Sequence, residues 1–378
     1  MQAAVLEAAS TIAIRDIPVP KPGPQELLVR VAAVGLCGTD IHIFRGEGNY
    51  NMDASGRVIP LEEQPQVLGH EFCGEAAELG SQVKGFKLGD RVVLDQGHNC
   101  HSDGRTPLCE YCQTGDSHQC AHYREHGITG LQGAMAEFVA VPAVNAVKIR
   151  DGLPFLEAVL AEPLGCIFHS TQMLERAAAR YTFDGDRKIR NILICGSGPA
   201  GLLFTQYFRQ VRGFEGRVIV ADVQERKLEL AKRFGAVTVN LRQQPLIEAV
   251  RELTHGERVE CLIDACGNSA LFEQVPWILR KQGTFVLYGH GHRGKDIGIL
   301  NLVQFLEPVL VAPIGASGGF DGNGSPVTYQ LALEAICSGK VDARSMITHP
   351  YRGLESVQRA LSEDCREPGY IKGIIQMS

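Results

Sequence analysis

Four residues that could share one metal ion stand in three separate segments of this chain. Cys37 lies in the run Cys37-Gly38-Thr39-Asp40, His70 and Glu71 are adjacent, and Glu162 lies much further along. One thiolate, one imidazole and one or two carboxylates form a mixed ligand set that suits a zinc ion with one open position. An open position on zinc serves chemistry on a bound oxygen atom. These residues therefore predict a catalytic zinc site.

A cluster of cysteines forms a second candidate metal site. Its members are Cys100, Cys109, Cys112 and Cys120. Four thiolates hold structural zinc in a tetrahedron, and zinc accepts variable loop lengths between them. Crowded thiols without a metal oxidise readily. We therefore expect a structural zinc here, with a metal-free lobe, or His98 or His101 replacing one thiolate, as the alternatives.

A glycine-rich loop indicates a dinucleotide site. The run Gly196-Ser197-Gly198-Pro199-Ala200-Gly201 follows an apolar strand expected over residues 189–195 and precedes a helix expected over residues 199–212. The first glycine permits the tight turn, the second lets the pyrophosphate approach the backbone, and the third lets helix and strand pack closely. The N-terminus of the helix, at Pro199 and Ala200, is then expected to face the phosphates and to offer them its free backbone N–H groups.

An aspartate predicts which dinucleotide binds. Asp222 is expected at the end of the next strand, where a carboxylate accepts hydrogen bonds from the adenosine ribose. The same charge repels a 2′-phosphate, so we expect NAD rather than NADP. Lys227 follows on the next helix and could touch the ribose, and together with Arg226 it leaves a little room for NADP.

Two regions with different sequence patterns are expected to position these residues. The first 150 residues contain short apolar stretches separated by glycine and proline turns, which predicts a small β-barrel. From about residue 155 helices and apolar strands alternate, which predicts a doubly wound parallel sheet. The last segment returns to mixed structure and ends in an apolar strand over residues 370–375. The predicted fold class is therefore α/β, with two domains.

The overall composition excludes several kinds of protein. The hydrophobic fraction of 44% and the charged fraction of 21% are ordinary for a globular chain. The net charge of −6 argues against a nucleic-acid or anionic-membrane partner. No long apolar run predicts a membrane span, and the residues that follow Met1 do not resemble a secretory signal. We therefore expect a cytoplasmic protein whose cysteines stay reduced.

Together these motifs closely resemble the zinc-dependent medium-chain dehydrogenases and reductases, in the sorbitol and threonine dehydrogenase-like branch of the alcohol and polyol dehydrogenases. The resemblance covers nearly the whole chain. Besides the cysteine cluster and the glycine loop it rests on Gly35-Leu36-Cys37-Gly38-Thr39-Asp40, Gly69-His70-Glu71, Gly89-Asp90-Arg91-Val92 and Ala161-Glu162-Pro163-Leu164. It implies a GroES-like β-barrel catalytic domain formed by residues 1–160 and 312–378, and a Rossmann NAD-binding domain over residues 161–311.

The resemblance also implies the ligands of the catalytic zinc. Cys37, His70 and Glu162 match ligand positions, and Glu71 matches a direct ligand of the sorbitol, glucose and threonine dehydrogenase branches. Glu71 and Glu162 would exchange at the fourth position, shared with water or substrate. A glutamate at position 162, where liver-type alcohol dehydrogenases have cysteine, favours the polyol branch.

Further positions are implied by the same resemblance. Three of the clustered cysteines match the structural zinc lobe, but the first cysteine of the family falls at Thr106, so Cys100 would complete an enlarged loop. Thr39 and His42 match a proton relay from the substrate oxygen, and Lys372 matches a basic position near the pyrophosphate. Weaker matches, to segments that pass the nicotinamide, are Tyr288-Gly289-His290 and Gly315-Ala316-Ser317.

The implied reaction is hydride transfer between NAD and a secondary alcohol or ketone. The polar stretch over residues 45–53 favours a polyol, sugar or cyclitol. The run Thr39-Asp40-Ile41-His42-Ile43 resembles threonine dehydrogenases, so an L-threonine-like amino alcohol is the alternative. A zinc-free, quinone-reductase-like nucleotide binder is disfavoured because the ligands are present. The family implies a homodimer or a homotetramer.

Overall fold

The computed structural model describes residues 1–53, 55–292 and 298–377, and the chain forms two compact units. The first unit comprises residues 1–165, 315–339 and 343–378, and the second comprises residues 166–314 and 340–342. The chain changes unit at residues 165/166 and 314/315, a few residues after the expected 160/161 and 311/312. The assignment of residues 340–342 to the second unit was not expected.

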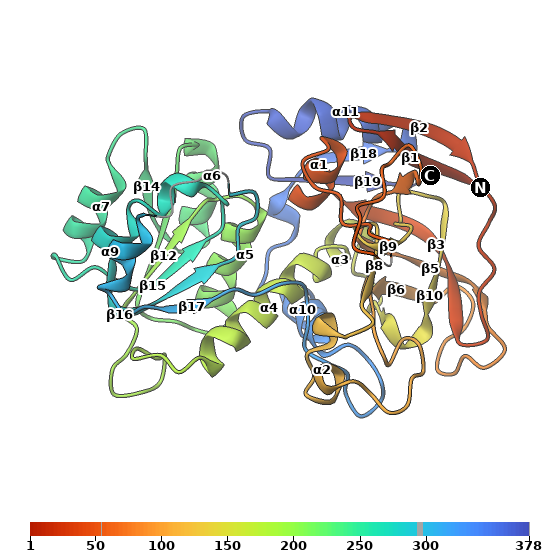
Figure 1. The fold of residues 1–378 in the computed structure, drawn as a ribbon, viewed down its shortest axis with the longest axis horizontal. Helices are drawn as coiled ribbons and strands as arrows, with labels where there is room; N and C mark the ends of the chain where they lie inside the picture. The colour runs from red at the N-terminus through yellow and green to blue at the C-terminus, as the bar shows by residue number, and fades with distance from the viewer. Residues whose placement is uncertain (54, 293–297, 378) are drawn as a thin grey trace. The chain divides into compact units, whose positions relative to one another are not determined.

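The first unit is built around a seven-stranded sheet with the order β11-β6-β5-β3-β19-β18, in which β10 also pairs with β3 (Figure 1). β3 lies in the apolar core of this unit, and most of its side chains are buried there. The strands of this sheet are β3 (Glu26–Gly35), β5 (Glu71–Leu79), β6 (Arg91–Leu94), β10 (Phe138–Pro142), β11 (Ala146–Lys148), β18 (Ile347–Arg352) and β19 (Lys372–Gln376).

Two small sheets and several short helices complete the first unit. One sheet is antiparallel, with the order β2-β1-β4, and the other has the order β7-β8-β9. Their strands are β1 (Gln2–Ala8), β2 (Thr11–Asp16), β4 (Gln66–Val67), β7 (Gly97–His98), β8 (Arg124–His126) and β9 (Gly130–Leu131). The helices are α1 (Gly38–Phe44), α2 (Glu110–Gln113), α3 (Phe155–Ala158), α10 (Val327–Cys337) and α11 (Val357–Ser362), and α4 (Ala161–Arg176) starts here and continues into the second unit.

The register of the central strands brings distant segments together. β3 is antiparallel to β5, β10 and β19, and Gly35 at its end lies opposite Glu71 of β5 and Ile374 of β19. The residues directly after β3 are therefore flanked by the starts of β5 and β19. Cys37, Glu71 and Lys372 meet at this edge of the sheet.

The second unit contains the predicted parallel sheet, with the strand order β14-β13-β12-β15-β16-β17 (Figure 1). The strand order reverses between β12 and β15, which is where open parallel sheets bind ligands. The strands are β12 (Asn191–Cys195), β13 (Arg217–Asp222), β14 (Val237–Asn240), β15 (Val259–Asp264), β16 (Leu279–Leu287) and β17 (Val309–Val311). The helices are α5 (Pro199–Gln206), α6 (Glu225–Arg233), α7 (Leu246–Leu253), α8 (Val275–Ile278) and α9 (Leu300–Gln304).

One helix of the second unit differs from its prediction. The helix expected over residues 199–212 is α-helical only as far as Gln206 and continues as a π-helical turn over Tyr207–Val211. None of the helices in the described residues combines the length and the apolar character that crossing a membrane requires.

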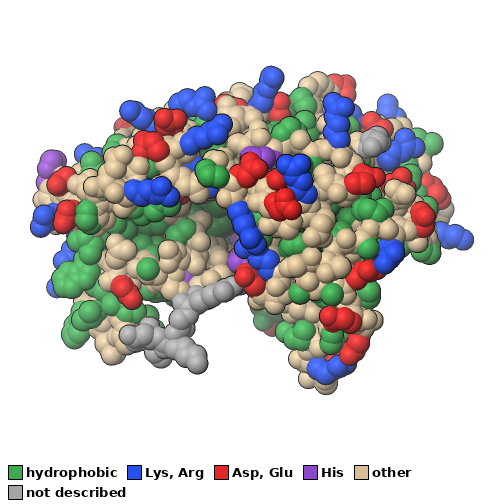
Figure 2. All heavy atoms as spheres, turned by 90° about the horizontal axis from the view of Figure 1, so that it is seen from above, with side chains coloured by type: hydrophobic (Ala, Val, Ile, Leu, Met, Phe, Trp, Pro, Cys, Tyr) green, Lys and Arg blue, Asp and Glu red, His purple; other side chains and the backbone are tan. Residues whose placement is uncertain are grey.

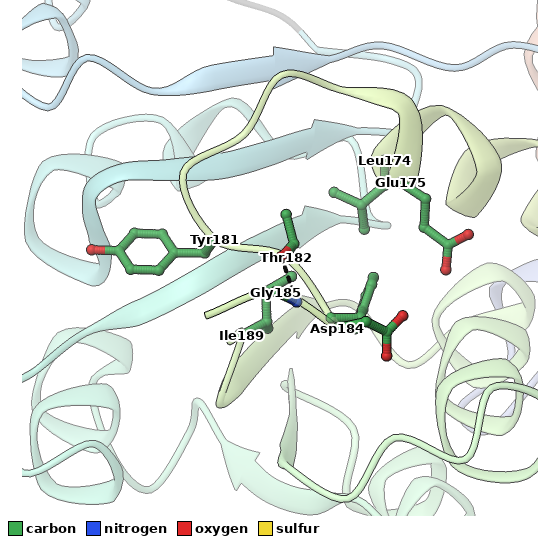
Figure 3. A pocket seen from close by; sticks show the side chains of 8 residues that line it. Leu174, Glu175, Tyr181, Thr182, Asp184, Gly185 and Ile189 are labelled. Atoms are coloured by element: carbon green, nitrogen blue, oxygen red, sulfur yellow. Dashed lines mark hydrogen bonds between the residues drawn. The ribbon is translucent and has the colours of Figure 1, made fainter. Parts of the chain in front are cut away.

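A pocket on the second unit contains none of the predicted site residues (Figure 3). It has a volume of about 190 Å³ and lies between the end of α4 and the loop over residues 181–189. Arg212 pairs with both acidic residues that line it, Glu175 and Asp184. Because these charges are already matched, we assign no ligand to the pocket.

Candidate active site and metal centres

Three of the predicted catalytic ligands come together in the first unit. One donor atom each from Cys37, His70 and Glu71 lie within 4.8 Å of one another. His70 and Glu71 are buried, while Cys37 is partly exposed. Sulfur, nitrogen and carboxylate oxygen at such distances form a donor set that fits zinc with a position left for substrate.

Asp40 fixes two of the segments that carry these ligands. Its fully buried carboxylate accepts hydrogen bonds from the backbone N–H of Cys37, at 2.9 Å, and of Gly69, at 3.2 Å. The same carboxylate lies 3.4 Å from Nδ1 of His70. A carboxylate that contacts a ligating histidine orients the ring, so Asp40 positions the ligands and is not expected to react.

The surroundings of His70 favour a positive charge. Burial lowers the pKa of His70, but the Asp40 carboxylate and the Cys37 sulfur outweigh it and raise that pKa well above its ordinary value. These groups would stabilise a bound metal cation in the same way. The electrostatics of the site therefore agree with its donor set.

Lys372 forms a buried ion pair with Glu71. Its Nζ lies 2.6 Å from Oε1 of Glu71 and 2.9 Å from the Leu36 carbonyl oxygen, and its expected place near the cofactor pyrophosphate stays a prediction. Burial lowers the pKa of Lys372, and the Glu71 and Cys37 charges raise it above its ordinary value. The register of β3, β5 and β19 brings Lys372 and Glu71 together.

Gly35 makes room for this ion pair. A Cβ atom on Gly35 would lie 2.2 Å from Oε2 of Glu71. A glycine at the end of β3 is therefore needed for the Glu71 carboxylate to occupy its present position.

The remaining predicted catalytic residues lie around this group. Thr39 Oγ1 is 3.7 Å from the Cys37 sulfur. Nδ1 of His42 is 2.7 Å from Glu47 Oε2. Glu162 is buried at the start of α4 but is not among the three residues that share the 4.8 Å group, and its Oε1 accepts a hydrogen bond from Gln96.

The four clustered cysteines have the geometry of a metal centre. Their sulfur atoms all lie within 4.8 Å of one another, and Cys120 Sγ is 3.7 Å from Cys100 Sγ and 3.8 Å from Cys109 Sγ. Four ligands placed about 2.3 Å from a tetrahedral zinc ion lie about 3.8 Å apart. Disulfide sulfurs lie about 2.05 Å apart, so the observed spacing fits a metal and not a disulfide.

The thiols of this cluster differ in acidity. Backbone N–H groups of Ala121 and Cys112 lower the pKa of Cys109 to about 6, whereas burial raises the pKa of Cys112. The alternative histidine ligands are engaged elsewhere. His98 Nε2 lies 3.1 Å from His126 Nε2, and the ring of His101 contacts Phe320.

The glycine loop of the second unit has the predicted form. Gly196 has a φ of +105°, which favours glycine, and a Cβ on Gly201 would lie 1.9 Å from the Gly196 carbonyl oxygen. Gly198 caps α5, in which Pro199 and Ala200 form the first turn. The backbone N–H groups of this turn, which begin at Ala200 because proline has none, can therefore bind phosphate oxygens.

Asp222 ends β13 beside this loop. Its carboxylate accepts hydrogen bonds from the backbone N–H of Ser197, at 2.7 Å, and of Gln224, at 2.9 Å. Asp222 thus stabilises the loop as well as carrying the charge expected at the ribose. Burial lowers the pKa of Lys227, and the Asp222 charge opposes that shift.

Two protein-family models match the parts of the chain that contain these two sites. The model of the alcohol dehydrogenase GroES-like domain matches residues 23–151, and the zinc-binding dehydrogenase model matches residues 199–336. The chain is a zinc-dependent medium-chain dehydrogenase. Its first unit is thus the GroES-like catalytic domain and its second the Rossmann domain, and the family acts on alcohols with zinc and a nicotinamide dinucleotide.

Curated relatives of this dehydrogenase come from the branch that the sequence predicted. Sorbitol dehydrogenase of Bacillus subtilis (strain 168) is 31% identical over 367 residues, which cover 96% of this chain and 92% of the relative. L-threonine 3-dehydrogenase of Pyrococcus horikoshii is 30% identical over 346 residues, covering 91% of this chain and 89% of the relative.

Solved structures of similar dehydrogenases hold either dinucleotide. A zinc-binding dehydrogenase from Sinorhizobium meliloti 1021 bound to NADP has a TM-score of 0.80 and 28% identity, covering 99% of this chain and 98% of the other. An alcohol dehydrogenase from Escherichia coli CFT073 complexed with NADH has a TM-score of 0.80 and 25% identity, covering 100% and 99%.

Two contacts of the dehydrogenase were missed by the sequence reasoning. Gln96 contacts Glu162, and Tyr329 of α10 contacts Gln96 in turn. The sequence contained one indication of a role for Gln96, because Asp95 and Gln96 are polar residues directly after the apolar strand that ends at Leu94. Nothing in the spacing of the sequence pointed to Tyr329.

Proposed function

We propose that this chain transfers a hydride between NAD and a secondary alcohol of a polyol, sugar or cyclitol, with zinc held by Cys37 and His70 and by Glu71 or Glu162. The observation that carries the proposal is the convergence of sulfur, imidazole and carboxylate donors in the catalytic domain. When bound there, zinc polarises the substrate oxygen as a Lewis acid. The four clustered cysteines hold a second, structural zinc.

The surrounding residues would move the proton. A carboxylate only accepts hydrogen bonds, so Nδ1 of His42 donates to Glu47 and Nε2 is its basic nitrogen. We propose that Thr39 relays the hydroxyl proton of the substrate, giving up its own proton as it receives that one, and that Nε2 of His42 takes the relayed proton and releases it to water. When bound, NAD would accept the carbinol hydride, so the products would be a ketone, NADH and a proton.

The proposed substrate class is supported more by the similarity to sorbitol dehydrogenase than by the polar loop over residues 45–53. Asn49, Asn51 and Asp53 form hydrogen bonds with Ile59, Gln66 and Ser55, so these side chains stabilise the loop itself. The similarity to sorbitol dehydrogenase therefore carries the preference for a polyol. An L-threonine-like amino alcohol is the second candidate, since an L-threonine 3-dehydrogenase is almost equally similar.

A screen of NAD reduction tests the proposal. The purified enzyme is offered polyols, sugars, cyclitols and β-hydroxy amino acids at equal concentration, and NADH formation is followed by absorbance. We expect the highest kcat/KM for a polyol, sugar or cyclitol. A higher value for L-threonine would select the second candidate, and no NADH from any of these alcohols would contradict both.

The choice of dinucleotide is tested at Asp222. We propose that its negative charge selects NAD, and we expect Asp222→Asn to lower the ratio of kcat/KM for NAD to that for NADP by about tenfold or more. Asparagine keeps an oxygen that can accept from Ser197 or Gln224, so the loop is retained better than with alanine. An equal loss with both cofactors would show that Asp222 supports the loop without selecting the cofactor.

We propose that the enzyme is a homodimer or a homotetramer joined through the edge of the Rossmann sheet. In the described part of the chain β17 lies at the end of the sheet and pairs with β16 alone. Large apolar side chains beside it are exposed, namely Phe305 at 77%, Leu310 at 59% and Ile314 at 66%. An unpaired strand edge with apolar neighbours suits the same edge of a second copy across a two-fold axis.

Leu310→Asp should separate the subunits. The aspartate would place two charges near each other in the proposed interface, so sedimentation should show a dimeric parent become a monomer or a tetrameric parent become a dimer. Leu88→Asp is the matched control, because Leu88 is 65% exposed in the other domain. A monomeric parent, or a variant with as many subunits as the parent, would rule out this interface.

The proposed partners and compartment follow from charge and redox state. On the face drawn in Figure 2, basic and acidic side chains are interspersed, which does not favour nucleic acid or an anionic membrane. All twelve cysteines are unbridged in the structure. Metal thiolates and free thiols persist in a reducing compartment, which supports a cytoplasmic location.

A further inference from the structure

A buried amide connects Glu162 to a second carboxylate. Nε2 of Gln96 lies 3.1 Å from Oε1 of Glu162 and 3.0 Å from Oε1 of Glu125. Gln96 is 1% exposed and Glu162 is 6% exposed. Hydrogen bonds to charged acceptors are stronger than those between neutral groups, so this amide restrains the Glu162 carboxylate.

The orientation of the amide is fixed from its other end. The hydroxyl of Tyr329, which is fully buried on α10, donates to Oε1 of Gln96. Carboxylates only accept hydrogen bonds, so the NH2 group must face Glu162 and Glu125 while the amide oxygen faces Tyr329. A rotation of the amide would lose these bonds.

The restrained carboxylate lies in the same unit as Cys37, His70 and Glu71 but outside their group of donor atoms. Glu71 is held by the ammonium group of Lys372, whereas the contact from Gln96 to Glu162 is made by a neutral group. The two candidate carboxylates are thus restrained by different partners.

We propose that Gln96 is a positioning residue that holds Glu162 beside Cys37 and His70 and sets how this carboxylate reaches the metal. The inference rests on the proposed metal role of Glu162. Without the amide, Glu162 and Glu125 lose a common donor and repel each other. Loss of a partner that orients a metal ligand lowers metal affinity by about 10–100-fold.

Gln96→Met tests the proposal, because methionine keeps the length of the side chain and removes both donors. The catalytic metal is exchanged for Co²⁺, and two quantities are measured: the visible absorption spectrum and the rate at which a chelator removes the ion. We expect a changed spectrum and a removal rate that rises about tenfold or more. Gln66→Met is the matched control, since Gln66 is a buried amide bonded to Asn51 and the Ile128 carbonyl oxygen.

Two further variants separate the possible failures. Tyr329→Phe frees the amide without removing it, and we expect a smaller change in the same direction. If Glu162→Gln changes the Co²⁺ spectrum while Gln96→Met and Tyr329→Phe both match the parent, the positioning role is wrong and the metal role of Glu162 stands. If Glu162→Gln leaves the spectrum unchanged, the metal role itself is wrong. If Gln96→Met does not fold, Tyr329→Phe decides alone.

Discussion

Replacing Cys37 with serine should lower kcat/KM by about a thousandfold while leaving NADH binding within about twofold. Polarisation of the substrate oxygen by a metal lowers the barrier by several kcal/mol, and each 1.4 kcal/mol corresponds to about tenfold in rate. Cys37 belongs to the donor group of the catalytic domain, whereas the glycine loop lies in the Rossmann domain. Steady-state kinetics measure kcat/KM, a fluorescence titration measures NADH binding, and metal analysis measures the zinc content.

Cys73→Ser is the matched control for this experiment. Cys73 is buried in β5 of the same sheet, and its sulfur lies 3.4 Å from the Phe155 carbonyl oxygen, outside the donor group. We expect the control to retain two zinc ions per chain and most of its activity. Substantial turnover by Cys37→Ser would place the catalytic metal elsewhere.

The second large effect is expected at the structural centre. Cys112→Ser removes one of four sulfurs, and we expect it to release one zinc ion per chain and to lower the melting temperature by roughly 10 °C. The physical reason is that a structural zinc contributes its binding free energy to folding, which is about 10 kcal/mol or more in small zinc domains. Metal analysis and calorimetry of the same sample measure both changes.

Cys337→Ser controls for the loss of a cysteine as such. Cys337 is half-buried in α10, and it is not a member of the sulfur cluster. We expect its metal content and melting temperature to match the parent. An unchanged metal content in Cys112→Ser would mean that the cluster holds no zinc.

The sequence predicted those features whose residues lie close together in the chain or in a fixed motif. The glycine loop follows from the spacing of Gly196, Gly198 and Gly201 around one turn, and the cysteine cluster follows from thiols within one short segment. In both cases local geometry decides the structure. The alternation of strands and helices likewise determined the fold class of the Rossmann domain.

The sequence did not predict contacts that depend on strand register and on packing between distant segments. Lys372 meets Glu71 because β19 and β5 pair with opposite sides of β3, and no local pattern specifies that arrangement. Tyr329 reaches Gln96 because α10 packs within the same unit, 233 residues further along the chain. Such partners become visible only when the fold is known.

The central place of β3 has a consequence during synthesis of the chain. The Nζ of Lys372 bonds to a backbone oxygen 336 residues earlier, at Leu36. At roughly 5–20 residues per second, a ribosome needs on the order of 20–70 s to translate that interval. β10 pairs with residues Glu26–Arg30 on the same edge of β3 much earlier, but until β19 is made the end of the edge, at Ala33–Gly35, has no neighbouring strand and Glu71 lacks Lys372 as its counter-ion. The catalytic site is therefore completed only after the Rossmann domain has been translated.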